Sequence, residues 1–176
     1  MRAEAASPIA RAEPVASRRD FVAAAMTAAA AAGAAGPAQA QAPANVRFLN
    51  PSGMATPTTY SHVVEVSGPH RTVYIAGQTG VDASGKFADG FRAQAVQVME
   101  NIKAALAAVG GSLEQVVKMN TYLTDTATQA PIFREVRDAY LNKAARPAAT
   151  SVQVVRLAQP GYLIEVEAIA ILSPRA

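Results

Sequence analysis

The residues best suited to chemistry lie in the last apolar segment of the chain, where Glu165 and Glu167 interrupt a run that ends at Leu172. The run alternates as a β-strand does, so both carboxylates project from one face and apolar side chains from the other. A carboxylate is costly to bury, so this face is either solvated or part of a polar pocket. In a pocket, a glutamate could position or activate a water molecule. On a solvated face, the pair would instead interact with Arg156 or Lys118 across the sheet. The spacing does not separate the two glutamates, and Glu165 is our preferred pocket residue.

Other kinds of site lack the residues that they need. The chain has no cysteine, which removes disulfides, thiolate metal ligands and thiol nucleophiles. His62 and His70 have no partners at the spacing of a metal site or a serine triad, so we expect no metal and no cofactor. His62 is either a pocket donor or an ordinary half-exposed strand residue, and we expect His70 in solvent. Residues 77–80 lack the lysine and the helix of a phosphate-binding loop. They are better explained as a bend where the backbone approaches another group closely.

The charge of the chain is small and its basic residues are scattered. The formal net charge is +3 over 176 residues. No stripe of lysine and arginine is present, so we expect no nucleic-acid partner.

Residues 1–40 have the pattern of an export signal of the twin-arginine type. Arg18 and Arg19 precede an alanine-rich run, which breaks at Gly36 and ends in a small-x-small site at Ala40. We expect cleavage after Ala40 and a periplasmic or secreted protein. The run is short and weakly apolar, so no stable membrane insertion is expected after cleavage.

Behind the signal, residues 41–48 are predicted to be a linker with the start of the first strand, and residues 49–173 a single domain. Alternating patterns predict strands, and spacings of three and four residues predict helices. The strands are expected at 46–49, 60–66, 72–76, 116–123, 150–156 and 162–172, and the helices at 91–109 and 129–141.

This element order predicts an α/β (α+β) fold with one mixed β-sheet and both helices on one of its faces. The strands at 60–66 and 72–76 are expected to form an antiparallel hairpin, and the last two strands to be joined by a turn at 159–161. The sheet face without helices needs a cover, and self-association would supply it, so an oligomer is expected.

Several short motifs together resemble the Rid/YjgF family, the reactive intermediate deaminases. The similarity extends from about residue 49 to residue 172, and its order and spacing are more specific than any one motif. The matching motifs are Tyr60-Ser61, Tyr74-Ile75-Ala76-Gly77-Gln78 with Asp82, Gln94 with Asn101-Ile102-Lys103-Ala104-Ala105-Leu106, Val116-Val117-Lys118 with Thr124-Asp125, Pro147-Ala148, and Glu165-Val166-Glu167-Ala168.

The resemblance implies a chorismate-mutase-like fold, a homotrimer and ligand pockets in the clefts between subunits. It also implies hydrolysis of enamines and imines to keto acid and ammonia without a metal. By the same resemblance, Glu165 handles the attacking water, while Tyr60 and Gly77 belong to the pocket.

One position departs from the family pattern. The family's Pro-Ala-Arg-Ser motif uses its arginine to hold the substrate carboxylate, and here Ala149 takes that place, followed by Thr150. We count both residues as lining the substrate site. A methyl group cannot make the bidentate contact of a guanidinium, and Arg137, Arg146 or Arg156 is left as a possible substitute.

The sequence therefore predicts an exported RidA-family trimer whose inter-subunit pocket binds a small polar or imine-type ligand, with 2-imino acid deamination weak or absent. The alternative is a hydrolase that deaminates other enamines or imines with a water positioned by Glu165. A ribonuclease, as some relatives are labelled, fits poorly with export and with the scattered charge.

Overall fold

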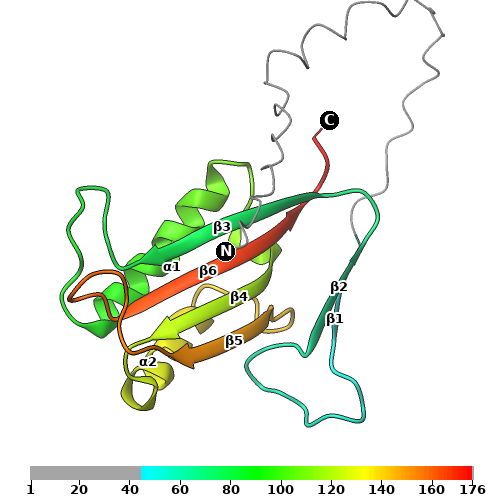
Figure 1. The fold of residues 1–176 in the computed structure, drawn as a ribbon. Helices are drawn as coiled ribbons and strands as arrows, with labels where there is room; N and C mark the ends of the chain where they lie inside the picture. The colour runs from blue at the N-terminus through cyan, green and yellow to red at the C-terminus, as the bar shows by residue number, and fades with distance from the viewer. Residues whose placement is uncertain (1–44, 176) are drawn as a thin grey trace, which may run out of the picture. The chain divides into compact units, whose positions relative to one another are not determined.

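The computed structural model describes residues 45–175, so the predicted export signal lies outside the described residues. Its strands form two sheets (Figure 1). No helix in this part of the chain is both long enough and apolar enough to cross a membrane. The elements are β1 (Asn45–Leu49), β2 (Val63–Ser67), β3 (Arg71–Thr79), α1 (Phe91–Ala107), the 3-10 turn η1 (Leu113–Gln115), β4 (Val116–Leu123), α2 (Thr126–Asp138), β5 (Ala148–Gln153) and β6 (Ile164–Leu172).

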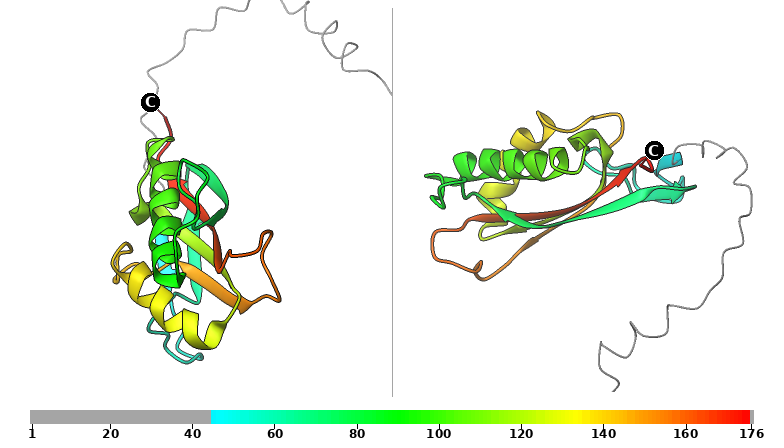
Figure 2. Two further views of the ribbon diagram at one scale, coloured as in Figure 1. Left: turned by 90° about the vertical axis from the view of Figure 1, so that its left-hand side faces the viewer. Right: turned by 90° about the horizontal axis from the view of Figure 1, so that it is seen from above.

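The larger sheet has the strand order β3-β6-β4-β5, and β1 and β2 form a separate antiparallel pair. β6 is antiparallel to both of its neighbours, whereas β4 and β5 run parallel. A parallel pair needs a crossover connection, and α2 provides it between β4 and β5. Both helices pack on the same face of this sheet (Figure 2).

The core lies between this sheet and the two helices. α1 contributes Val98, Ile102 and Leu106, none of which is exposed to solvent, at spacings of four residues. Such spacing places apolar side chains on one helix face. Alternate residues of β6, among them Ile164 and Val166, meet them from the sheet.

α2 begins one turn earlier than predicted. The carboxylate of Asp125 accepts hydrogen bonds from the backbone N–H groups of Ala127 and Thr128, which caps the helix before residue 126. Aspartate is a favoured N-cap residue because it satisfies N–H groups that have no partner inside the helix. The apolar period alone placed the start at residue 129.

The predicted fold class, with two helices on one face of a mixed sheet, is confirmed. Two of the predicted strand pairings are wrong. β2 pairs with β1 rather than with β3, so the strands divide into two sheets instead of one. The last two strands are not neighbours either, because β4 lies between β5 and β6. Local patterns indicate where strands are, but not which strands hydrogen-bond to each other.

The sheet face opposite the helices carries several large exposed side chains. Tyr74 on β3 is 78% exposed, and Val152 on β5 is 41% exposed. In the loop after β5, Val155 is fully exposed. This face has no covering element among residues 45–175 (Figure 2).

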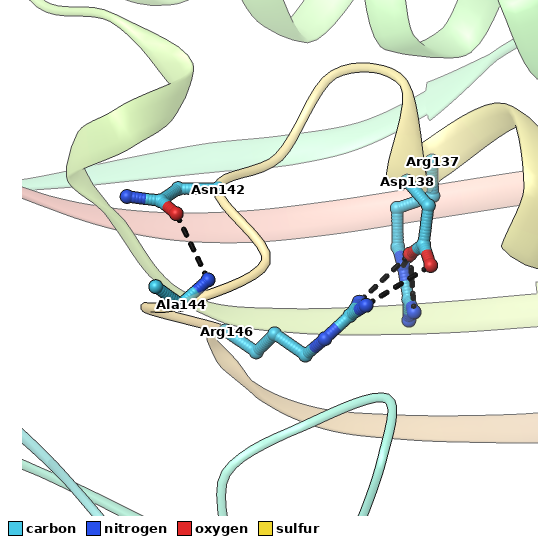
Figure 3. A network of polar contacts seen from close by, with 5 residues as sticks. All are labelled: Arg137, Asp138, Asn142, Ala144 and Arg146. Atoms are coloured by element: carbon cyan, nitrogen blue, oxygen red, sulfur yellow. Dashed lines mark hydrogen bonds and ion pairs between the residues drawn. The ribbon is translucent and has the colours of Figure 1, made fainter.

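An ion-pair network holds the end of α2 to the segment before β5 (Figure 3). Oδ1 of Asp138 accepts hydrogen bonds from Arg137 Nη2 at 3.0 Å and from Arg146 Nη1 at 2.8 Å. Its Oδ2 accepts from Arg146 Nη2 at 3.1 Å. In the intervening loop, Asn142 Oδ1 accepts from the backbone N–H of Ala144 at 2.9 Å. One carboxylate therefore serves two guanidinium groups.

This network predicts a pH-dependent contribution to stability. Hydrogen bonds from Arg146, and then from Arg137, lower the pKa of Asp138 from its ordinary value of 3.8 to about 2. A depressed pKa stabilises the folded state fully above the ordinary value, and the contribution is lost as the pH falls from about 4 through about 2. We expect Asp138→Asn to lower the free energy of unfolding by on the order of 2 kcal/mol at neutral pH, but by much less near pH 2. Urea denaturation across this range measures both values, and an equal difference at every pH would contradict the prediction.

Candidate functional site

Glu165 lies on the open face of the sheet, directly over Gly77. A Cβ atom at residue 77 would overlap Oε1 of Glu165, so only glycine leaves room for the carboxylate. The register of β3 against β6 shifts between Ile75 and Gln78, which marks a bulge at this point. The sequence predicted a bend near residue 77 where the backbone comes close to another group, and that group is the side chain of Glu165.

The structure separates the two glutamates that the spacing left equivalent. Glu167 Oε1 accepts hydrogen bonds from Asn120 Nδ2 at 2.6 Å and from Tyr122 Oη at 3.1 Å. The hydrogen bond to Glu167 raises the pKa of the Tyr122 hydroxyl. Glu165 is half-buried, and its carboxylate has no hydrogen-bond partner among residues 45–175. Within the described residues, both carboxylate oxygens of Glu165 are thus available to a ligand or a water molecule, whereas one oxygen of Glu167 is already engaged.

A second feature, a cavity of about 200 Å³, lies on the helix side of the sheet. It is bounded by α2, β4, β5 and the segment before β2. Its lining residues are Thr59, Tyr60, Met119, Thr121, Ala130, Phe133, Arg134, Arg137, Ala149, Thr150 and Ser151. The cavity thus brings together three predicted site residues, namely Tyr60, Ala149 and Thr150.

Hydrogen bonds fix the wall that carries Tyr60. The backbone N–H of Ser61 donates to the carbonyl of Pro147 at 3.2 Å, and its Oγ donates to the carbonyl of Arg146 at 2.7 Å. Ser61 is buried, so these bonds attach the residue after Tyr60 to the chain that leads into β5. His62 Nε2 forms a 2.8 Å hydrogen bond with the carbonyl of Ala55, a structural contact within its own loop.

The three arginines considered as substitutes occupy different positions. Arg137 lines the cavity together with Ala149, and only 8% of the residue is exposed. Arg146 is engaged by both oxygens of Asp138. Arg156 is exposed on the loop between β5 and β6. The structure therefore places Arg137, among these three, beside the position where the family has its arginine.

Within one chain, the cavity and Glu165 are apart. Ala149 pairs with Met119 and Glu165 pairs with Tyr122, so two strand spacings and three residues separate them. At about 4.8 Å per strand and 3.3 Å per residue, their backbones are roughly 14 Å apart. Alternation also places Ala149 on the helix face with buried Met119, and Glu165 on the open face. A single chain therefore does not join the five predicted residues into one site.

Sequence reasoning missed two features of this region. Asn120 and Tyr122 bind Glu167, and the polar alternation of β4 would have indicated them once β4 was paired with β6. Arg137 follows buried Phe133 by four residues, so both lie on the same face of α2. That spacing was the available signal for a cavity arginine.

Residues 45–175 contain no group of three or more histidine, aspartate or glutamate side chains that could hold a metal ion. Glu165 offers a carboxylate, and the cavity offers several hydroxyls and the guanidinium groups of Arg134 and Arg137. Such groups can transfer protons and bind anions.

Comparisons with known proteins agree with this architecture. Residues 51–172 match the family model described as Endoribonuclease L-PSP. A RutC family protein of Pyrococcus horikoshii is 42% identical over 100 residues, which cover 56% of this chain and 77% of that protein. The 2-iminobutanoate/2-iminopropanoate deaminase of Bos taurus is 38% identical over 119 residues, covering 65% and 81% of the two chains.

Solved structures of Rid-family proteins are similar to this chain in fold and in sequence. The crystal structure of a Rid-family protein of unknown function from Yersinia pestis superposes with a TM-score of 0.64 at 36% identity, covering 73% of this chain and 99% of that one. RidA from an Antarctic Psychrobacter gives a TM-score of 0.55 at 44% identity, covering 67% and 92%. The chain belongs to the Endoribonuclease L-PSP family, which is the Rid/YjgF family that its motifs indicated.

Proposed function

We propose that this protein is an exported, homotrimeric imine and enamine hydrolase of the Rid family, which works at a pocket between subunits without a metal or cofactor. Its deamination of 2-imino acids is weaker than that of relatives with the motif arginine. The observation that carries the proposal is the Glu165 carboxylate, which lies over Gly77 with no partner in residues 45–175. The name of the bovine relative, an iminobutanoate and iminopropanoate deaminase, supports the reaction class.

Hydrolysis of an imine requires a base that removes protons from the attacking water and then delivers them to the imine nitrogen. A water molecule held by Glu165 attacks the imine carbon, the C–O bond forms, and the π electrons of the C=N bond move to nitrogen. The carboxylate takes a proton from the water and passes it to nitrogen, and it then relays the hydroxyl proton in the same way. The C–N bond breaks to release ammonia and leave the carbonyl product. General acid–base catalysis by a positioned carboxylate typically contributes about 10²- to 10⁴-fold.

In this proposal, Glu165 and the cavity are the two half-sites of one shared site, and their separation within a single chain supports a pocket between subunits. Glu165 and the cavity with Tyr60 and Ala149 lie on opposite faces of the sheet, roughly 14 Å apart along its backbone. The open face also exposes Tyr74 and Val152. A second copy packed on this face would cover the apolar side chains and bring its own cavity toward Glu165.

The replacement of arginine by Ala149 supports weaker binding of 2-imino acids. A charge-assisted hydrogen bond is worth about 1.5–3 kcal/mol net. Its loss corresponds to roughly 10- to 150-fold in affinity for a carboxylate. Substrates without a carboxylate would not be affected.

We further propose that the partners do not include nucleic acid. Arg47 and Arg92 are each ion-paired with a glutamate, Glu65 and Glu135 respectively, at 2.7 Å. These pairs reduce the positive charge that a phosphate backbone would meet. Export of the protein rests on the pattern of residues 1–40 alone.

Glu165→Gln is expected to lower the kcat for any imine substrate about 100-fold or more, because the amide cannot accept the proton of water. Glu167→Gln is the matched control on the same strand. It should retain turnover, since Glu167 is already engaged by Asn120 and Tyr122. Steady-state hydrolysis of 2-aminoacrylate, generated in the assay, measures both variants. Equal loss in the two variants would contradict the assignment of Glu165.

Subunit mixing tests whether the site is shared. Glu165→Gln removes one half-site, and Ala149→Leu obstructs the other, so each variant alone should be impaired. Trimers assembled from both variants would contain some sites with two intact halves. Recovered activity after mixed refolding is expected, and activity no higher than that of either variant alone would argue against a shared site.

Ala149→Arg is expected to raise kcat/KM for 2-aminoacrylate by about tenfold or more, because it restores a charge-assisted contact to the carboxylate. Turnover of an uncharged imine should change little. Kinetic comparison of the two substrates separates carboxylate binding from general effects. A gain that is equal for both substrates, or no gain, would contradict the role assigned to position 149.

Export is tested by fractionation of cells that express the full chain. The wild-type protein is expected in the periplasmic fraction with residues 1–40 removed, as mass spectrometry of the recovered chain will show. Replacement of Arg18 and Arg19 by lysine should leave the precursor in the cytoplasm, because a twin-arginine signal depends on this pair. Retention of the wild-type precursor in the cytoplasm would overturn the proposal.

A further inference from the structure

The cavity beside Ala149 contains a buried arginine that belongs to a helix rather than to the strand. Only 8% of Arg137 is exposed, and the residue lines the cavity together with Ala149 and Tyr60. Arginine is rarely buried to this extent unless its charge is compensated. The partners of its guanidinium group therefore decide whether it can still bind an anion.

The compensation within the protein is incomplete. Nε and Nη2 of Arg137 both donate to the same oxygen of Asp138, at 3.4 and 3.0 Å. That oxygen also accepts from Arg146, which occupies the second oxygen as well. Nη1 of Arg137 has no hydrogen-bond partner among residues 45–175. Residues 45–175 also contain no fully buried side-chain nitrogen or oxygen without a partner, so Nη1 retains contact with open space.

Positive charges outnumber negative charges in the region of the cavity. Arg134 and Arg137 line the cavity, and Arg137 shares the carboxylate of Asp138 with Arg146. The neighbouring Glu135 is paired with Arg92, so Asp138 is the one carboxylate among residues 45–175 that is ion-paired within this group of three arginines. This group carries a formal surplus of two positive charges. Burial lowers the pKa of Arg137, whereas the hydrogen bond to Asp138 raises the pKa of Arg146. Asp138 therefore compensates the charge of Arg146 more fully than the charge of Arg137.

The remaining lining suits a small polar anion. Thr59, Thr121 and Ser151 contribute hydroxyl groups, and Ala149 leaves space that a longer side chain would fill. A volume of about 200 Å³ corresponds to about seven water molecules at roughly 30 Å³ each. An organic acid with a similar number of non-hydrogen atoms fits this space.

We propose that Arg137 binds the carboxylate of small 2-oxo and 2-imino acids in this cavity, so that the anion site has moved from β5 to helix α2. The inference rests on the proposed function for the reaction itself, and it names the substrate class. Because Arg137 shares its fork with Asp138, it presents one edge rather than a full bidentate pair, and binding is weaker than in relatives with the strand arginine.

Titration with 2-oxobutanoate, followed by calorimetry or NMR, tests the proposal without any turnover. The wild-type protein is expected to bind 2-oxobutanoate more tightly than its neutral amide. Arg137→Gln should weaken binding of the acid by about tenfold or more and leave the amide unaffected, as expected for loss of a charge-assisted hydrogen bond. Arg137→Lys should retain part of the affinity because it keeps the charge. Arg156→Gln, an exposed arginine outside the cavity, is the matched control and should bind as the wild type does.

Equal affinities for Arg137→Gln and Arg156→Gln would overturn the proposal, as would the absence of a preference for the acid over its amide. Thermal melting shows whether Arg137→Gln remains folded. If it does not, Ala149→Glu places a competing carboxylate beside Arg137, and unchanged binding of the acid by that folded variant would also overturn the proposal. A protein that binds the acid through Arg137 but hydrolyses no imine would refute the proposed function alone.

Discussion

The fold depends on the register of β6, the strand that lies between β3 and β4. Its alternate residues, from Ile164 to Ala170, are buried against the helices, and its two glutamates occupy the positions between them. A slip of one residue would bury both carboxylates and expose the apolar side chains, so the hydrophobic effect fixes the register strongly. The same burial that stabilises the domain thus determines where the carboxylate of Glu165 points.

The two glutamates differ in their neighbours on the adjacent strands. Glu167 meets the amide of Asn120 and the hydroxyl of Tyr122, which fix it as a hydrogen-bonded structural group. Glu165 lies over Gly77, which has no side chain and so leaves room for the carboxylate. The bulged backbone at this point provides no hydrogen-bond donor to Glu165 in the described residues. Two identical side chains on one strand therefore have different hydrogen bonding. Glu167 lies beside two donors, whereas Glu165 lies beside a glycine that has no side chain.

Much of the fold could be predicted from periodicity, since the helices and strands between residues 45 and 175 leave apolar patterns in the sequence. The pairing of strands could not, because hydrogen bonding between strands depends on long-range packing and β5 joins β4 only through α2. At the site, Glu165, Gly77 and Tyr60 were indicated by type and motif. The place of Arg137 was left open, because a charged residue on a helix gives no sign of burial until the neighbouring elements are packed around it.

The placement of the two half-sites on opposite faces of one sheet has a kinetic consequence. Under the proposed function, an isolated chain holds a base without a substrate cavity and a cavity without a base. Specific activity would then follow the association equilibrium of the subunits and fall on dilution, even while every chain stays folded. Protein concentration would itself act as a control on catalysis, which is a property of geometry rather than of any single residue.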